Sequence, residues 1–127
     1  MIFKKYLLLF MLILSAFTIN AQQNIKNITV DNGLPSNIIF DIQQDKIGYL
    51  VIATNKGLVK FDGDDFTQIN KLNTHTIFIK DDVIYAGSEN GLFIKNKSKE
   101  QFIKGKKILK IFIKDDKLFL GTQEGIF

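Results

Sequence analysis

Three pairs of polar residues that can bind a ligand recur in this chain at a constant spacing. Each pair stands directly before a glycine, and the three glycines lie 34 residues apart: Asn55-Lys56 before Gly57, Glu89-Asn90 before Gly91, and Gln123-Glu124 before Gly125. Amide, ammonium and carboxylate groups bind polar ligands by hydrogen bonds and ion pairs. Loops that vary in chemistry on a constant scaffold are where binding sites usually lie. We therefore predict ligand contacts at Asn55, Lys56, Glu89 and Asn90.

The reactive side chains do not form a catalytic or metal-binding pattern. The chain has no cysteine and one histidine, His75, which excludes thiolate nucleophiles, disulfides and clusters of several histidine ligands. Ser88 is not at the centre of a G-x-S-x-G motif, and threonines replace it in the other copies, so we expect its hydroxyl to stabilise a turn. We expect His75 to be a surface or turn residue, because no triad partner is evident. We predict no enzyme activity, no metal and no cofactor.

Two charged segments have both a functional and a structural interpretation. Residues 62–65 (Asp-Gly-Asp-Asp) resemble part of a calcium loop but lack its distant glutamate, so a tight turn explains them better. Eight lysines with only Glu100 among them form a basic stretch that could attract acidic polysaccharide or anionic lipid. Solvated turns and strand edges explain this stretch better. The eight are Lys95, Lys97, Lys99, Lys104, Lys106, Lys107, Lys110 and Lys114.

The N-terminal segment has the pattern of a secretory signal peptide. Two lysines precede the apolar run 6–17, and Ala21 offers a cleavage site. The run is shorter than the roughly 20 residues that cross a membrane, and an uncleaved anchor is the alternative. We predict a signal peptide over residues 1–21 and an exported chain, periplasmic or associated with the outer membrane, which touches the membrane only through this segment. The remainder has 15 lysines against 13 acids, which gives no footprint for nucleic acid.

The repeat that carries the polar pairs is composed of short strands. Residues 77–82 match residues 111–116, whereas the first copy has Ile42-Gln43-Gln44-Asp45 followed by three extra residues, 46–48. Apolar runs between polar turns predict four strands per copy, and nearly continuous runs predict sheets covered on both faces. Four antiparallel strands per repeat are typical of β-propeller blades. We predict an all-β fold over residues 22–127 with blades at about 37–70, 74–106 and 109–127.

The first copy resembles the two-component regulator propeller repeat. The matching segments are DNGLPSN at 31–37, IQQD at 42–45, GYLVIAT at 48–54 and GLVKFDG at 57–63. The family pattern is roughly GLPSN, an acidic turn with DxxG, and LWIGTxxGLxRYDG. Val51, Ala53 and Lys60 stand where tryptophan, glycine and arginine are usual, and the later copies lack the DxxG insert. The resemblance covers about residues 27–127.

This resemblance implies a ligand-sensing module of a two-component signal transduction protein. Polysaccharide fragments, or another small extracellular ligand, are the implied partner. The family's sensors continue into a kinase or regulator, whose motifs do not occur in this sequence. A structural propeller of the cell envelope, similar to those of the type IX secretion apparatus, is the alternative function. A propeller-fold enzyme is the third, which the residues do not support.

The number of repeats predicts an incomplete propeller. Closed propellers typically have 4–8 blades, whereas about two and a half are present, and residues 125–127 align with the start of a third strand. Outer blades left alone would expose apolar faces and strand edges. We therefore expect a fragment of a longer sensor, completed by the missing blades of its parent chain. Self-association of several copies into a ring is the alternative.

Overall fold

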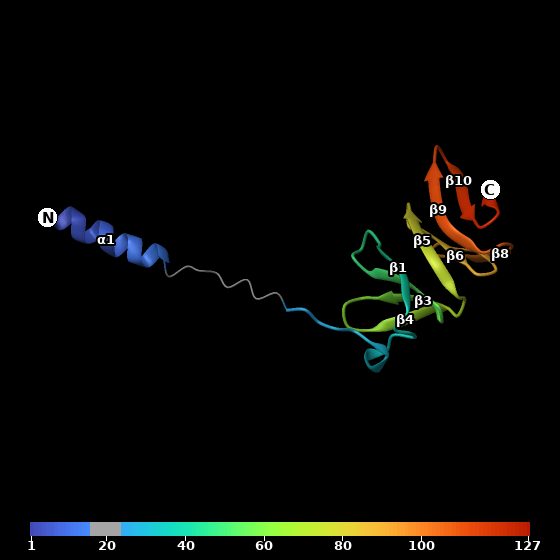
Figure 1. The fold of residues 1–127 in the computed structure, drawn as a ribbon, viewed down its shortest axis with the longest axis horizontal. Helices are drawn as coiled ribbons and strands as arrows, with labels where there is room; N and C mark the ends of the chain where they lie inside the picture. The colour runs from blue at the N-terminus through green and yellow to red at the C-terminus, as the bar shows by residue number, and fades with distance from the viewer. Residues whose placement is uncertain (16–23) are drawn as a thin grey trace.

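A computed structural model describes residues 1–15 and 24–127 of the chain (Figure 1). It begins with an apolar helix, α1 (Ile2–Ser15), which covers most of the apolar run of the predicted signal peptide. The predicted cleavage site after Ala21 lies outside the described residues. Within the described ranges, no helix has the length and apolarity that a membrane span requires. A short 3-10 helix, η1 (Val30–Asn32), then precedes the strands.

Eleven strands form three antiparallel sheets in the described part of the chain. The first sheet contains β1 (Ile39–Gln44), β2 (Leu50–Thr54), β3 (Gly57–Phe61) and β4 (Phe66–Asn70). The second contains β5 (Thr74–Lys80), β6 (Val83–Ser88), β7 (Gly91–Lys95) and β8 (Glu100–Lys104). The third contains β9 (Ile108–Lys114), β10 (Lys117–Thr122) and β11 (Gly125–Ile126). Within each sheet, every strand pairs with the next along the chain, and two of the sheets have four strands. This confirms the prediction of an all-β fold with four-stranded antiparallel sheets for the first two copies of the repeat.

The repeated glycines are required where the second strand of a sheet turns into the third. Gly57 and Gly91 have φ angles of 143° and 142°, a backbone conformation that residues other than glycine rarely adopt. A Cβ atom on Gly57 would lie 2.3 Å from the carbonyl oxygen of Asn70, and one on Gly91 would lie 2.1 Å from that of Ile103. Both carbonyls belong to the fourth strand of the same sheet, so the glycine lets that strand approach.

The first turn of the first sheet differs from the alignment made on the sequence. The paired residues Gln44 and Leu50 enclose five residues, whereas Ile79 and Ile84 enclose four in the second sheet. The first copy is therefore longer by one residue, and the predicted insertion of three residues at 46–48 is wrong. Strand pairing decides this point, because Ile52 lies opposite Ile42 and its counterpart Ala86 lies opposite Ile77.

The three sheets pack face to face through two apolar interfaces. Val51, Ala53 and Leu58 of the first sheet pack against a group from the second sheet that includes Ile77 and Phe93. The opposite face of the second sheet packs, through Leu92, against Ile108 and Ile111 of the third. Both faces of the second sheet are covered, which explains its nearly continuous apolar strands. The first strands of the sheets are neighbours: β1 lies beside β5, and β5 beside β9 (Figure 1).

The outward face of the first sheet is covered by the segment that enters it. Leu34 is 7% exposed and packs on Ile52 and Val59, beside the stacked rings of Phe61 and Phe66. Thr29 caps η1 by accepting a hydrogen bond from the Asp31 amide. The GLPSN segment therefore covers the outward face of the first sheet through Leu34.

Candidate functional site

The predicted ligand loops are turns held by one repeated hydrogen-bond pattern. The Thr54 hydroxyl donates to the Gly57 carbonyl oxygen (2.8 Å) and accepts from the Lys56 amide (3.1 Å). Ser88 donates to the carbonyl oxygen of Gly91 (2.8 Å), and Thr122 donates to that of Gly125 (3.0 Å). The prediction that this hydroxyl stabilises the turn is confirmed. Each turn thus has the same base and a different pair of residues at its tip.

Glu89, a predicted ligand contact, is held by a histidine and a lysine. Its carboxylate oxygen lies 2.7 Å from Nε2 of His75 and 3.2 Å from Nζ of Lys107. The hydrogen bond with His75 and the contact with Lys107 lower the pKa of Glu89. His75 is the second residue of β5 and Lys107 precedes β9, so this cluster connects the second and third sheets.

The expectation that His75 is a surface or turn residue is wrong. His75 lies in β5, its side chain is 13% exposed, and the Phe40 ring lies 4.8 Å from the imidazole ring. The neighbouring strand β1 and the turn before β7 cover it, and both come from elsewhere in the sequence. Sequence inspection missed this cluster, because its members stand 14 and 18 residues from Glu89.

The other predicted contact residues differ in how their side chains are placed. Lys56 and Asn90 have exposed side chains, and their backbone carbonyls accept hydrogen bonds from Gln68 and Gly105. Asn55 is partly buried, and its side-chain oxygen is buried without a hydrogen-bond partner among the described residues. The structure brings His75 and Lys107 to Glu89 but shows no contact between the side chains of Asn55, Lys56 and Glu89.

Asn73 adds an amide to this end of the sheets that sequence inspection missed. Its backbone carbonyl accepts a hydrogen bond from the Glu89 amide (2.9 Å). Its side-chain oxygen, like that of Asn55, is buried without a partner in the part of the chain that the structure describes. Buried polar atoms normally have partners in water, protein or ligand. The side-chain oxygens of Asn55 and Asn73 therefore each lack a donor that water or a ligand would have to supply.

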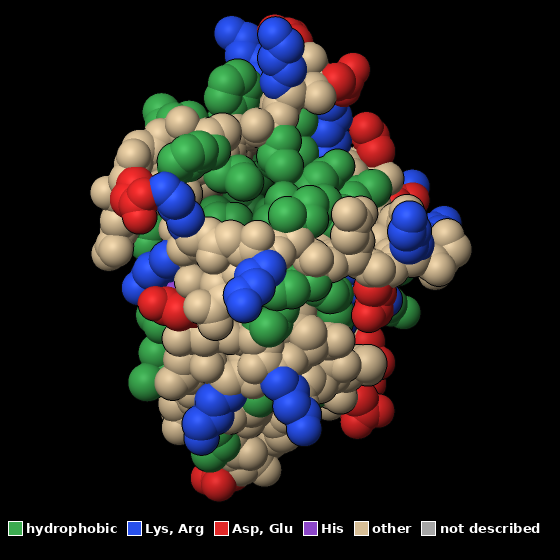
Figure 2. Space-filling view, turned by 90° about the vertical axis from the view of Figure 1, so that its right-hand side faces the viewer, with side chains coloured by type: hydrophobic (Ala, Val, Ile, Leu, Met, Phe, Trp, Pro, Cys, Tyr) green, Lys and Arg blue, Asp and Glu red, His purple; other side chains and the backbone are tan. Residues whose placement is uncertain are grey.

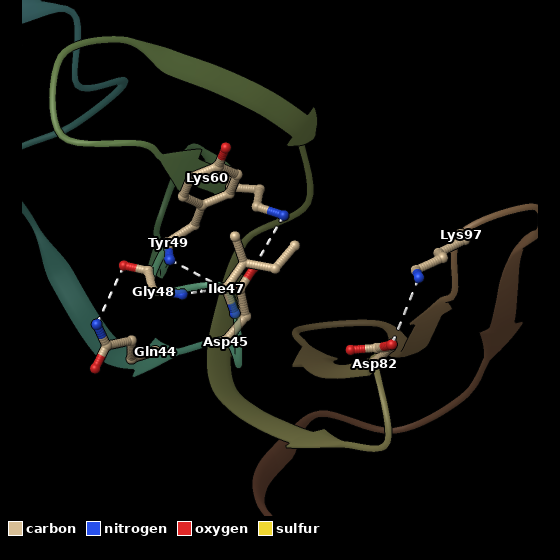
Figure 3. A network of polar contacts seen from close by, with 8 residues as sticks. All are labelled: Gln44, Asp45, Ile47, Gly48, Tyr49, Lys60, Asp82 and Lys97. Carbon is tan, nitrogen blue, oxygen red and sulfur yellow. Dashed lines mark hydrogen bonds and ion pairs between the residues drawn. The ribbon is translucent and has the colours of Figure 1, made fainter.

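The opposite end of the sheets is closed by internal hydrogen bonds (Figure 3). Asp45 Oδ1 accepts from the amides of Ile47, Gly48 and Tyr49 at 2.9–3.0 Å, and Oδ2 pairs with Lys60 (3.0 Å). Partial burial raises the pKa of Asp45, but the hydrogen bonds from Lys60 and the turn amides outweigh burial and lower it. The carboxylate of Asp45, the first residue of the DxxG motif, therefore takes its hydrogen bonds from the amides of its own turn and from Lys60.

Acidic side chains at this closed end also take structural roles. Asp82 pairs with Lys46 of the first sheet (2.6 Å) and with Lys97 (3.7 Å; Figure 3). The hydrogen bond from Lys46 is the main cause of the lowered pKa of Asp82. Asp62 Oδ1 accepts from the amides of Asp64 and Asp65 at 2.9 and 2.8 Å, which confirms the predicted tight turn.

Half of the basic stretch is paired with carboxylates. Lys97 and Lys107 pair with acids more than ten residues away in the sequence, and Lys106 pairs with Glu124. Lys95 pairs with Glu100 across the β7–β8 hairpin. These pairs favour the interpretation of the stretch as turns and strand edges over a docking site for anionic polymers.

Comparison with known proteins relates the chain to signalling proteins. No family model matches it, so membership of the propeller repeat family stays a prediction. Over 54 residues the chain is 43% identical to histidine kinase P4 of Formosa agariphila. The matched segment covers 40% of this chain and 4% of that protein. The chain shares a fold with the extracellular domain of a protein assigned to the one-component systems of B. thetaiotaomicron. That likeness has a TM-score of 0.67 and 21% identity, and it covers 80% of this chain and 16% of the other. The chain thus spans a small part of each, and the second likeness concerns the fold alone.

Proposed function

We propose that this chain is part of a ligand-sensing β-propeller of a two-component signal transduction protein. The observation that carries the proposal is the repetition of one sheet with one turn design and different turn tips, gathered at one end. The extracellular sensor fold and the histidine kinase among the similar proteins support it. The proposed role is binding, to which the varied polar residues at the tips of the described turns are suited.

The proposed ligand is a carbohydrate or another small polar molecule that contacts Asn55, Lys56, Glu89 and Asn90. Sugar hydroxyls donate hydrogen bonds, and the buried side-chain oxygens of Asn55 and Asn73 have no donor among the described residues. Lys56 and Asn90 offer exposed donors at the tips of neighbouring turns. Glu89 is held in a fixed position by His75 and Lys107, which lowers the entropic cost of binding.

A calorimetric titration tests the binding role. The full chain is titrated with a neutral oligosaccharide and with a uronic acid oligosaccharide of the same length. We expect Lys56→Ala or Asn55→Ala to weaken binding about five- to tenfold, the effect of losing one hydrogen bond of about 1 kcal/mol or slightly more. Lys99→Ala is the matched control, because Lys99 is exposed and lies in the β7–β8 turn at the opposite end. Equal affinities for Lys56→Ala and Lys99→Ala, or no binding at millimolar sugar, would refute the proposed site.

The proposal includes export by a signal peptide over residues 1–21, with propeller blades in residues 22–127. The apolar helix α1 occupies the region where such a signal has its hydrophobic segment. N-terminal sequencing of the protein recovered from the periplasm should begin at Gln22. A sequence that begins at Met1 would contradict cleavage.

A further inference from the structure

The outward face of the third sheet is apolar and open. Phe112, Phe119 and Ile126 are 54%, 39% and 76% exposed on it. They line a hollow of about 440 Å³ together with two lysines, Lys110 and Lys114. On the side of the molecule that carries the C-terminal strands, hydrophobic side chains gather in an area with charged groups at its margin (Figure 2).

The same positions are covered one repeat earlier. Leu92, the counterpart of Ile126, is 3% exposed and packs against the third sheet. A Cβ atom on Gly87 would lie 2.5 Å from the side chain of Ile108, so this interface is close-packed. At its counterpart Gly121, the nearest atoms belong only to the neighbouring residue on β9, Lys110, at 3.5 Å or more. The open face therefore has the shape of an interface between sheets without its second half.

A lysine–aspartate ion pair crosses each of the two existing interfaces, from the turn residue Lys46 in the first case and from Lys80, the last residue of β5, in the second. Lys46 pairs with Asp82 between the first and second sheets, and Lys80 pairs with Asp116 between the second and third. Both pairs join residues 36 positions apart. Lys114 stands one repeat after Lys80 and lines the open face. Among the described residues it has no ion-pair partner, so the face presents a cation where the covered faces have a pair.

The edge of the third sheet is open as well. A Cβ atom on Gly57 or Gly91 would collide with the carbonyl oxygen of a fourth strand, whereas one on Gly125 would meet nothing within 4 Å. The β11 edge can therefore receive a fourth strand, as the β3 and β7 edges do. In the second sheet, the chain passes from the fourth strand, β8, into β9, the first strand of the sheet that packs on it. A fourth strand beside β11 would lead into the open face of the third sheet in the same way.

A second copy of the chain does not fit the open face. Two open faces placed together would bring Lys110 and Lys114 of both copies into one interface that has no acid on either lining. The outward face of the first sheet, which a head-to-tail ring would use, is covered by Leu34. The occupant must bring an apolar sheet face and a carboxylate.

We propose that the open face of the third sheet binds a further sheet of the same 34-residue repeat, and that Lys114 pairs with a carboxylate in the first turn of that sheet. This inference rests on the blade arrangement in the proposed function and not on ligand binding. Its failure therefore leaves the titrations with oligosaccharide unaffected.

The experiment extends the full chain after Phe127 by a copy of residues 94–127. Phe127 corresponds to Phe93, so the copy continues the repeat in phase and its Asp116 equivalent stands 36 residues after Lys114. Since the chain has no cysteine, Lys114→Cys combined with cysteine at the Asp116 equivalent gives a unique pair for a short bismaleimide. The reference pair is Lys80→Cys with Asp116→Cys in the unextended chain.

We expect the Lys114 pair to be cross-linked within the chain to an extent within about twofold of the reference pair. A second extension, a copy of residues 60–93, places the equivalent of Asp82 at the same distance and covers the case in which the first does not fold. Cross-linking of the reference pair and of neither extension would overturn the proposal. In a cross-linking extended chain, Lys114→Met should lower the urea midpoint, and in the unextended chain it should not. If Lys114→Met leaves the urea midpoint of the extended chain unchanged, the proposed ion pair of Lys114 is refuted.

Discussion

Replacement of Gly57 by alanine tests whether the repeated glycine exists for the close approach of the fourth strand. Gly57 and Gly63 belong to the same sheet and both have positive φ angles, 143° and 111°. A Cβ atom on Gly57 would lie 2.3 Å from the Asn70 carbonyl oxygen, whereas one on Gly63 would meet nothing within 4 Å. Gly63→Ala therefore measures the backbone strain alone.

The two substitutions should differ by the cost of the steric overlap. Positive φ in a residue with a side chain costs about 1–3 kcal/mol. Forcing extra volume into a packed region costs about another 1–3 kcal/mol. Gly63→Ala is therefore expected to lower the free energy of unfolding by about 1–3 kcal/mol, and Gly57→Ala by about 1–3 kcal/mol more.

Urea denaturation of the full chain, followed by far-ultraviolet circular dichroism, measures both effects. The denaturant slope should stay constant if the variants change stability and not the compactness of either state. If Gly57→Ala is no less stable than Gly63→Ala, the approach of β4 does not explain why glycine recurs every 34 residues in this chain. The reasoning about the fourth strand at Gly91 and Gly125 would then fail with it.

Three further substitutions test the turns and the contacts between sheets. Ser88→Ala should lower the free energy of unfolding by about 1–3 kcal/mol, because it leaves the Gly91 carbonyl without its buried donor; Ser88→Thr, the residue type of the other two copies, should stay near the wild type in thermal melts. Asp41→Ala should speed amide exchange at Ile77, whose N–H donates to Asp41 Oδ2 at 2.8 Å, while Asp41→Asn keeps an acceptor; unchanged exchange in both would show that this bond does not hold β1 to β5. Asp45 has a pKa below its ordinary 3.8, so its stabilising effect is complete above that pH and is lost as the pH falls through the lower value of the folded state. Asp45→Asn should therefore reduce the loss of urea midpoint between about pH 6 and pH 3, and an unchanged loss would contradict this role.

The repeat and its strands could be predicted from the sequence, because they depend on local chemistry. The turn glycines, the hydroxyl before them and the acidic turn 81–82 act through contacts within a single hairpin. Asp81 and Asp82 both adopt positive φ angles there, as aspartate in a two-residue turn can. Strand order in each sheet follows chain order, so no long-range choice was needed to place them.

The candidate site was only partly visible in the sequence. The pattern identified the variable turn tips, including Asn55 and Glu89, but not the groups that surround them. In the sequence, His75 is a single histidine with no evident partner. Its contacts with Glu89 and Phe40 arise only when β5 packs against its neighbours. Asn73 looks like an ordinary loop residue until its buried side-chain oxygen is seen.

By itself, the sequence determined the 34-residue period, the hairpins and the chemistry of the turn tips, since each arises from residues close together along the chain. Tertiary structure alone decided which sheets face one another, which residues cross between them and which face stays open. The ion pair of Lys46 with Asp82 and the cover that Leu34 gives to the first sheet are of this kind. Such contacts depend on how twisted sheets pack, and spacing along the chain does not encode that directly.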